Sequence, residues 1–175
     1  MLSKSMDDLQ IQFKKLLTLP VLGFLILFTS VSIGSQNIGE SYFLKPVAET
    51  YPIASTFGLK THPVLKTELE HFGIDYKVPI GTPVLASKSG TITHLGKKGS
   101  YGETIIIDHG NGFKSLYSNL SEFTSALKVG SEVIQGEEIA RSGNSGLAVD
   151  AHLHFAIMKK GTFVDPAPLL QQLED

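Results

Sequence analysis

The strongest indication of fold in this chain is the stretch Thr104-Ile105-Ile106-Ile107-Asp108-His109-Gly110-Asn111-Gly112-Phe113. Its first half is a short apolar run bounded by polar residues, which is typical of a strand. The pair Asn111-Gly112 favours a tight turn, because both residues tolerate the positive φ that such a turn needs. The stretch therefore predicts a β-hairpin.

Similar short apolar runs, separated by glycine-rich turn signals, follow one another from Val47 onward. This spacing is typical of an all-β domain. The predicted strands are Thr82–Ala86, Gly90–Leu95, Glu103–Asp108, Phe113–Leu120, Glu132–Ile134, Glu138–Ala140 and Leu153–Met158. The residues expected to form the core are Phe57, Val84, Ile92, Ile105, Ile107, Leu116, Val133, Ile139, Leu153, Phe155 and Ile157.

The last predicted strand includes the pattern His152-Leu153-His154. Side chains at i and i+2 of a strand point to the same face, so the two histidines project together. Leu153, Phe155 and Ile157 then face the core. We therefore expect the histidines to face a groove.

A second pattern, His71-Phe72-Gly73-Ile74-Asp75, places a histidine and a carboxylate four residues apart. They share a face in a strand or in a helix, but Gly73 would cost about 1 kcal/mol in a helix interior, which favours the extended form. Imidazole and carboxylate are ligands of catalytic zinc, which keeps a fourth position open. We predict that two neighbouring strands bring His71, Asp75 and His154 onto one tetrahedral Zn²⁺ site, where the metal activates water.

Further short motifs accompany these two patterns in a definite order. They are Ser55-Thr56-Phe57-Gly58, His62-Pro63, Gly81-Thr82-Pro83-Val84-Leu85-Ala86, Tyr101-Gly102, Ile107-Asp108-His109-Gly110-Asn111-Gly112 and Ser142-Gly143-Asn144-Ser145-Gly146.

In content and order, these motifs resemble the lysostaphin-type (LytM-like) zinc metallopeptidases, metallopeptidase family 23, over roughly residues 45–170. These hydrolases cut peptide cross-links of bacterial peptidoglycan. The resemblance implies a duplicated-hybrid-motif-like domain, which is a barrel-like or sandwich antiparallel β domain. It also implies zinc ligation by His71, Asp75 and His154, and a catalytic or transition-state-stabilising role for His152.

One position departs from the family pattern. The family has a second catalytic histidine in a Tyr-x-His-Leu stretch, which here reads Tyr117-Ser118-Asn119-Leu120. Asn119 can stabilise an oxyanion by a hydrogen bond, but it cannot transfer a proton. Loss of a general acid or base costs about 10²–10⁴ in rate. The sequence therefore predicts an intact metal site with incomplete catalytic machinery.

Other polar residues have weaker patterns. Tyr117 and Asn119 share a strand face by the period of two, so both are predicted to line the groove. His62 precedes Pro63 and is a further candidate for the groove. His94 is interpreted as a surface residue, and His109 as a turn residue held by a hydrogen bond. The segment 142–146 lacks the Gly-Lys-Ser/Thr ending of a phosphate loop and is expected to form a groove wall.

The amino-terminal part has a different composition. Lys14 and Lys15 precede an uncharged apolar stretch from Leu16 to Gly34, which is near the lower length limit of a membrane span. The flanking lysines place the amino terminus in the cytoplasm. A signal peptide cleaved after Gly34 is the alternative. The expected organisation is a lead and anchor or signal helix at 1–34, a linker at 35–44, a peptidase domain at 45–170 and a tail at 171–175.

Bulk properties restrict the class of partner. The net charge of −2 and pI near 6.3 argue against nucleic-acid binding. The chain has no cysteine, so it has no disulfide framework and no thiolate metal site.

Two functions remain open from the sequence. The first is a zinc endopeptidase acting on peptidoglycan peptides, either anchored in the inner membrane with its domain outside the cytoplasm or secreted to the periplasm. The second is a catalytically impaired zinc-binding module that binds peptidoglycan or regulates another cell-wall hydrolase through an envelope protein partner.

Overall fold

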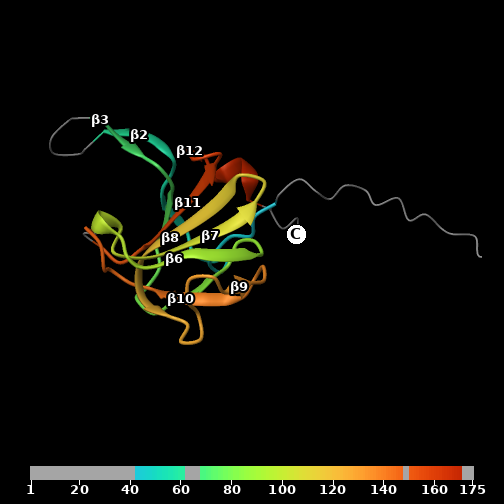
Figure 1. Ribbon diagram of the computed structural model, residues 1–175. Helices are drawn as coiled ribbons and strands as arrows, with labels where there is room; N and C mark the ends of the chain where they lie inside the picture. Colours follow the sequence, from blue (N-terminus) through green and yellow to red (C-terminus); the bar gives the residue numbers. More distant parts are fainter. Residues whose placement is uncertain (1–41, 62–67, 148–149, 171–175) are drawn as a thin grey trace, which may run out of the picture. The chain divides into compact units, whose positions relative to one another are not determined.

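The computed structural model describes residues 42–61, 68–147 and 150–170, all within one compact unit, Gly39–Asp175 (Figure 1). Within these residues the chain forms strands and two short 3₁₀ helices, so the all-β prediction is confirmed. The predicted anchor or signal helix and the tail lie outside the described residues. In the described part, no helix combines the length and apolar character needed to cross a membrane.

The strands are β1 (Ile53–Ser55), β2 (Gly58–Thr61), β3 (Glu68–His71), β4 (Ile74–Tyr76), β5 (Pro83–Leu85), β6 (Gly90–Lys97), β7 (Glu103–Gly110), β8 (Phe113–Phe123), β9 (Glu132–Val133), β10 (Glu138–Ser142), β11 (Leu153–Lys159) and β12 (Thr162–Val164). The 3₁₀ helices are η1 (Gly99–Tyr101) and η2 (Ala167–Leu169).

All strand pairs are antiparallel, and most belong to one sheet with the order β1-β4-β11-β8-β7-β6-β9. Strands β12, β10 and β5 branch from this path, while β2 and β3 form a separate two-stranded sheet. The antiparallel β domain is as predicted, but its barrel-like form is not closed within the described residues. A barrel needs its two end strands to pair, whereas β1 pairs only with β4, and β9 only with β6.

The predicted hairpin is confirmed by β7 and β8. Asn111 and Gly112 connect the two strands with φ of 51° and 80°, and Gly110 pairs with Phe113 across the turn. Positive φ at both central residues matches the right-handed twist of the flanking strands. Each of the other predicted strands overlaps a strand of the structure, so the apolar runs locate β5 to β11 correctly.

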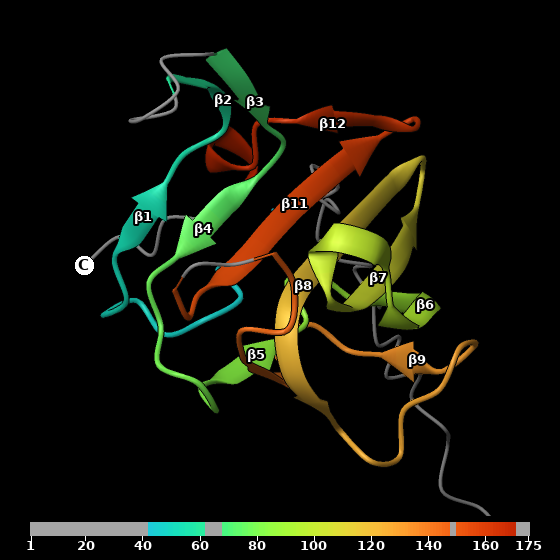
Figure 2. The same cartoon turned by 90° about the vertical axis from the view of Figure 1, so that its left-hand side faces the viewer.

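Strand β11 lies between β4 and β8 near the middle of the main sheet (Figure 2). Leu153, Phe155 and Ile157 on this strand are fully buried, as predicted. Every predicted core residue is buried except Phe57, which is only partly buried. The core also contains large side chains that the prediction omitted: Phe43, Val47, Ile74, Tyr76, Val78, Tyr117 and Leu120.

The folded domain includes part of the predicted linker. Phe43 is fully buried and forms a parallel bridge with Leu170, while the Leu44 N–H donates to the carbonyl of Ser87 at 2.7 Å. The linker prediction is therefore wrong at its carboxyl end, because an aromatic side chain in a short polar segment gives no periodic signal.

His109 is part of a hydrogen-bonded chain beneath the sheet. Its Nδ1–H donates to the carbonyl of Ser89 at 2.9 Å, and its Nε2 lies 2.7 Å from Ser115 Oγ. Ser115 Oγ and Tyr117 Oη are 2.9 Å apart, and the Tyr117 oxygen accepts the Ser87 N–H at 2.8 Å. This network explains His109 without a catalytic role.

Acid should destabilise the protein partly through His109. Burial lowers the pKa of His109 from its ordinary value of 6.5, so below that pH the unfolded chain binds more protons than the folded one. The free energy of unfolding then falls as the pH drops through this window. We expect His109→Gln to lose this part of the acid sensitivity and to cost about 1 kcal/mol near neutral pH.

Urea unfolding between about pH 5.5 and pH 7.5 measures both effects. His94→Gln is the matched control, because His94 contacts only the nearby Gly96 carbonyl among the hydrogen bonds of the described residues. A profile for His109→Gln that runs parallel to that of the unmodified protein would contradict the assignment.

Candidate metal centre

Three side chains converge at the junction of β3, β4 and β11. His71 ends β3, while Asp75 and His154 face each other across the β4–β11 pair. His71 Nε2 lies 3.1 Å from Asp75 Oδ1 and 3.2 Å from His154 Nδ1, and His154 Nδ1 lies 2.8 Å from Asp75 Oδ1. The sequence-predicted triad is therefore brought together.

The donor set fits zinc. Two imidazole nitrogens and one carboxylate oxygen form a three-ligand set that leaves one position open. Bonds of about 2.0–2.2 Å in a tetrahedron place ligand atoms about 3.3–3.6 Å apart. The separations of 3.1 and 3.2 Å are close to this range, and the separation of 2.8 Å between His154 and Asp75 is shorter. Within the described ranges, this is the cluster of His, Asp and Glu side chains that could hold a metal ion.

The ring of His71 is oriented for ligation by hydrogen bonds behind it. Its Nδ1–H donates to the carbonyl of Thr56 at 2.8 Å, and Ser55 Oγ lies 3.3 Å from the same nitrogen. This bond leaves the Nε2 lone pair directed at the cluster. Metal-binding histidines commonly use their second nitrogen in this way.

Asp75 is held as a carboxylate. Burial opposes its ionisation, but the hydrogen bonds with His154 and His71 outweigh burial and keep the pKa of Asp75 well below its ordinary range. The hydrogen bond with Asp75 in turn raises the pKa of His71. An ionised carboxylate with two imidazoles has the charge that a divalent cation requires.

Gly73 allows β4 and β11 to approach closely at this point. A Cβ atom at position 73 would lie 2.5 Å from the carbonyl oxygen of Phe155 and 2.7 Å from His154 Cε1. The first contact is with the backbone, so any larger residue must move β11 or the His71–Asp75 connection. This observation gives a structural reason for the glycine between the two ligands.

Gly73→Ala is expected to lower zinc affinity by at least about tenfold, the smallest effect typical of losing a partner of a metal ligand. It should also lower the free energy of unfolding by about 1–3 kcal/mol through overpacking. Gly90→Ala is the matched control, because its Cβ would meet the Asp108 carbonyl at 2.3 Å, far from the metal centre. Competition with a chelator measures the affinity, and equal affinities for the two variants would contradict the role of Gly73.

His152 lies beside the triad, as predicted. Its Nε2 is 3.8 Å from Asp75 Oδ1, and its Nδ1–H donates to the carbonyl of Asp150 at 2.9 Å. This hydrogen bond places the proton on Nδ1 and leaves the Nε2 lone pair for the site. Asn119 Nδ2 donates to that same Nε2 at 2.6 Å.

Asn119 reaches this site through an unusual backbone conformation. Its φ is 60°, which interrupts the strand alternation in β8. Ser118 pairs with His154 and Tyr117 pairs with Phe155, so the unbroken alternation would put Asn119 on the core side. The left-handed conformation, which asparagine adopts more readily than most residues, turns the amide towards His152 instead.

The predicted groove position of Tyr117 is wrong. Its side chain is fully buried, its ring packs on Phe155 at a centroid distance of 5.3 Å, and its hydroxyl accepts the Ser87 N–H. The prediction failed because it assumed regular alternation through Asn119. His62, the other predicted groove residue, lies outside the described residues.

The segment 142–146 was predicted to form a groove wall, but none of its residues lines either cavity beside the triad; the segment packs against Asn119 instead. A Cβ at Gly146 would lie 2.4 Å from Asn119 Oδ1, and Ser145 Oγ accepts the Glu103 N–H at 2.8 Å. The loop thus packs directly against the side chain that contacts His152.

Two cavities flank the triad, and both include Asp75 and His152 in their walls. One, of about 560 Å³, is lined by Leu69, Glu70, His71, Phe72, Asp75, Ser100, Tyr101, Ser118, Asn119, Leu147, His152 and His154. The other, of about 860 Å³, is lined by Tyr51, Pro52, Ala54, Asp75, Lys77, Val78, Pro79, Asp150, Ala151 and His152. An extended chain lying across the metal centre could occupy both.

Sequence reasoning missed Tyr101 and Lys77 as site residues. The Tyr101 ring lies 5.6 Å from that of His154, and its Tyr-Gly motif was the available signal. Lys77 follows Asp75 by two residues, and strand alternation could have identified it.

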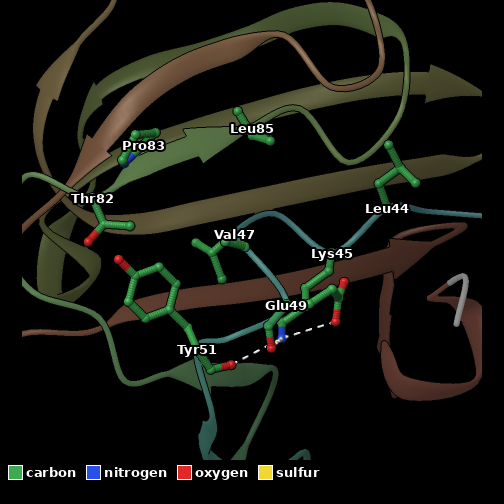
Figure 3. A pocket seen from close by; sticks show the side chains of 9 residues that line it. Leu44, Lys45, Val47, Glu49, Tyr51, Thr82, Pro83 and Leu85 are labelled. Carbon is green, nitrogen blue, oxygen red and sulfur yellow. Dashed lines mark hydrogen bonds and ion pairs between the residues drawn. The ribbon is translucent and has the colours of Figure 1, made fainter. Parts of the chain in front are cut away.

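A third cavity, of about 380 Å³, is lined by residues other than the triad, and Figure 3 shows the side chains of its walls. Its walls are mostly apolar, with Leu44, Val47 and Leu85 among them. Lys45 Nζ donates to the Glu49 carboxylate at 3.3 Å and to the Tyr51 carbonyl at 3.0 Å, so the two charged groups of this cavity bind each other. None of the triad lines it.

Comparison with known proteins gives consistent matches. The model of peptidase family M23 matches residues 69–166. The DD-carboxypeptidase/endopeptidase Mpg of Neisseria meningitidis serogroup B is 44% identical over 114 residues, which are 65% of this chain and 26% of that protein. The peptidoglycan DD-endopeptidase ShyA of Vibrio cholerae is 35% identical over 127 residues, 72% of this chain and 29% of that protein.

Among solved structures, a zinc-containing peptidase from Vibrio cholerae superposes with a TM-score of 0.67 and 30% identity. The match covers 77% of this chain and 41% of that one. The chain thus spans less than a third of the length of the two curated relatives.

Proposed function

Because this chain belongs to peptidase family M23, as its motifs predicted, we propose that it is a zinc-dependent endopeptidase that hydrolyses peptide bonds in bacterial peptidoglycan. The observation that carries the proposal is the convergence of His71 Nε2, Asp75 Oδ1 and His154 Nδ1. Relatives named as peptidoglycan and DD-endopeptidases support the substrate class.

In this mechanism His71, Asp75 and His154 hold the zinc ion. When bound, zinc polarises the carbonyl of the scissile bond and activates water as a nucleophile. The protein contributes a fixed three-ligand set, in which the Thr56 carbonyl orients the His71 ring. The cavities on the two sides of the triad offer space for a peptide that lies across the ligands, which would orient the scissile bond.

His152 moves the proton. Its Nδ1–H is fixed on the Asp150 carbonyl, so Nε2 is the basic atom and faces the site. Nε2 takes a proton from the attacking water and then gives it to the leaving amine, as a general base and acid does. The carbonyl of Asp150 keeps the ring in the required tautomer during both transfers.

Asn119 supports a second candidate function. Its amide donates to His152 Nε2 at 2.6 Å and therefore occupies the lone pair that must accept the proton. Asn119 itself has no proton to transfer. A zinc-binding module with impaired catalysis, which binds peptidoglycan or regulates another cell-wall hydrolase, accommodates this contact without requiring turnover.

The proposed place of action is the bacterial cell envelope, because peptidoglycan lies outside the cytoplasm. The apolar stretch from Leu16 to Gly34 supports this proposal as an anchor or a cleaved signal. An envelope protein partner belongs to the second candidate function.

Mass spectrometry tests the proposal. Purified protein loaded with zinc is incubated with purified peptidoglycan, and the released fragments are identified. We expect new peptide termini that disappear when zinc is removed by a chelator and return when it is restored. Release that is unaffected by zinc removal would overturn the proposal, whereas sedimentation with peptidoglycan without any release would favour the impaired module.

A further inference from the structure

Lys77 lies one residue beyond the end of β4, and the alternation of buried and exposed side chains that includes the metal ligand Asp75 continues through it. In the segment that follows Gly73, Ile74, Tyr76 and Val78 are buried, whereas Lys77 is exposed. Residues two apart on a strand point to the same face and are separated by about 6.6 Å. The lysine is therefore directed towards the groove in which the metal centre lies.

The cavity next to the metal centre confirms this placement. Lys77 lines the cavity of about 860 Å³ together with Asp75 and His152, and it is the one lysine or arginine among the described lining residues. The remaining walls are largely apolar, with Pro52, Ala54, Val78, Pro79 and Ala151.

The charge of Lys77 is available to a ligand. The ion pairs formed among the described residues do not include Lys77. The cavity has two carboxylates, Asp75 and Asp150. Asp75 is engaged by the two ligand histidines. An ammonium group attracts an anion more strongly when apolar walls partly surround it than when it lies in open solvent.

The opposite cavity differs in character. In this cavity of about 560 Å³, the charged residue other than the triad and His152 is Glu70. The exposed apolar side chains of Leu69 and Leu147 line the same cavity. Lys77 thus lies on one side of the metal centre and Glu70 on the other, and the cavity with Lys77 also contains Asp150. A peptide whose anionic group lies on one side of the cut bond would be bound in one direction only.

We propose that Lys77 is a specificity-determining residue that binds a carboxylate of the substrate. This carboxylate should lie within about two residues of the bond that is cut, because an extended chain rises by about 3.3 Å per residue. This inference rests on the proposed peptidase function and adds the chemical class of the substrate, a peptide with an anionic group beside the scissile bond. The carboxylate is either the carboxyl terminus of the peptide or a side chain.

Matched peptides identify the carboxylate and test the inference. Stem-type peptides ending in D-alanyl-D-alanine are prepared as the free acid and as the terminal amide, and a second pair has a side-chain carboxylate or its amide. Binding to metal-free protein is measured by calorimetry, and cleavage by the zinc-loaded protein is measured as kcat/KM.

For the unmodified protein we expect one of the two free-acid peptides to bind about three- to tenfold more tightly than its matched amide. This difference is the range expected for an exposed charge pair. Lys77→Met should remove the difference, Lys77→Arg should retain most of it, and Lys77→Glu should reverse it. The preference should weaken as salt is added. Lys128→Met, at an exposed lysine outside both cavities, should leave it unchanged.

The two proposals fail in different ways. Absence of cleavage for every peptide, with the acid preference intact in binding, would overturn the peptidase proposal and retain the role of Lys77. Equal binding of acid and amide by the unmodified protein, or an acid preference that persists in Lys77→Met, would overturn the inference about Lys77 whether or not the peptides are cut.

Discussion

Replacement of His154 by alanine is expected to abolish stoichiometric zinc binding and, with it, peptide hydrolysis. Loss of a residue that merely orients a metal ligand costs about 10–100-fold in affinity, so loss of a ligand should exceed the upper end of that range. His154 is only 7% exposed and sits between Gly73 and the ring of Tyr101. The substitution leaves two ligands at the centre.

Competition with a chromophoric chelator measures this loss, and circular dichroism checks that the domain remains folded. His154→Gln fills more of the same space and serves as a second variant if alanine unfolds the protein. His94→Ala is the control, because His94 contacts only the Gly96 carbonyl by side-chain hydrogen bond within the described ranges. Full zinc affinity in a folded His154→Ala would refute the assignment of the triad.

Asn119→His should give the largest gain of activity, about 10²–10⁴-fold in kcat, the effect typical of a positioned general acid or base. Histidine tolerates the positive φ at this position better than most residues. It would replace an amide that blocks His152 Nε2 with a group that can itself exchange a proton. Zinc affinity should stay the same, because Asn119 is not a ligand.

Asn119→Ala separates the two contributions of the new histidine. Alanine frees His152 Nε2 without adding a proton donor, but it suits the φ of 60° at this position less well than asparagine. Asn119→Gly is therefore the second variant, because glycine adopts positive φ readily, and a gain shared by both variants measures release of the blocked lone pair. Turnover of peptidoglycan by Asn119→His that is no faster than that of the unmodified protein, at equal zinc affinity, would show that position 119 does not limit catalysis.

Much of the sheet could be predicted because its signals are local. The isoleucine run before Asn111-Gly112 gave the β7–β8 hairpin, and the alternation from Leu153 to Ile157 gave the buried face of β11. Strands β1, β2 and β12 were missed because each has four residues or fewer. The extended form expected for His71–Asp75 is present, but it is divided between the end of β3 and β4. Phe43 was missed because its partners, such as Leu170 and Phe113, are distant in sequence.

The triad could be predicted, and the groove only in part. His71, Asp75 and His154 were recognisable because ligand chemistry restricts the residue types and because the patterns match a family. Tyr117 was assigned to the wrong face because one left-handed residue, Asn119, reverses the alternation that the prediction used. Lys77 was overlooked although its spacing of two residues from Asp75 was a signal present in the sequence.

The left-handed backbone at Asn119 also bears on how such a domain could change over generations. Few side chains suit that conformation, and asparagine and histidine are both among the enriched ones. Their codons differ at the first base alone. A single nucleotide exchange could therefore replace asparagine by histidine at position 119, or the reverse, without any rearrangement of β8. The site would then hold either an amide or a side chain that transfers protons.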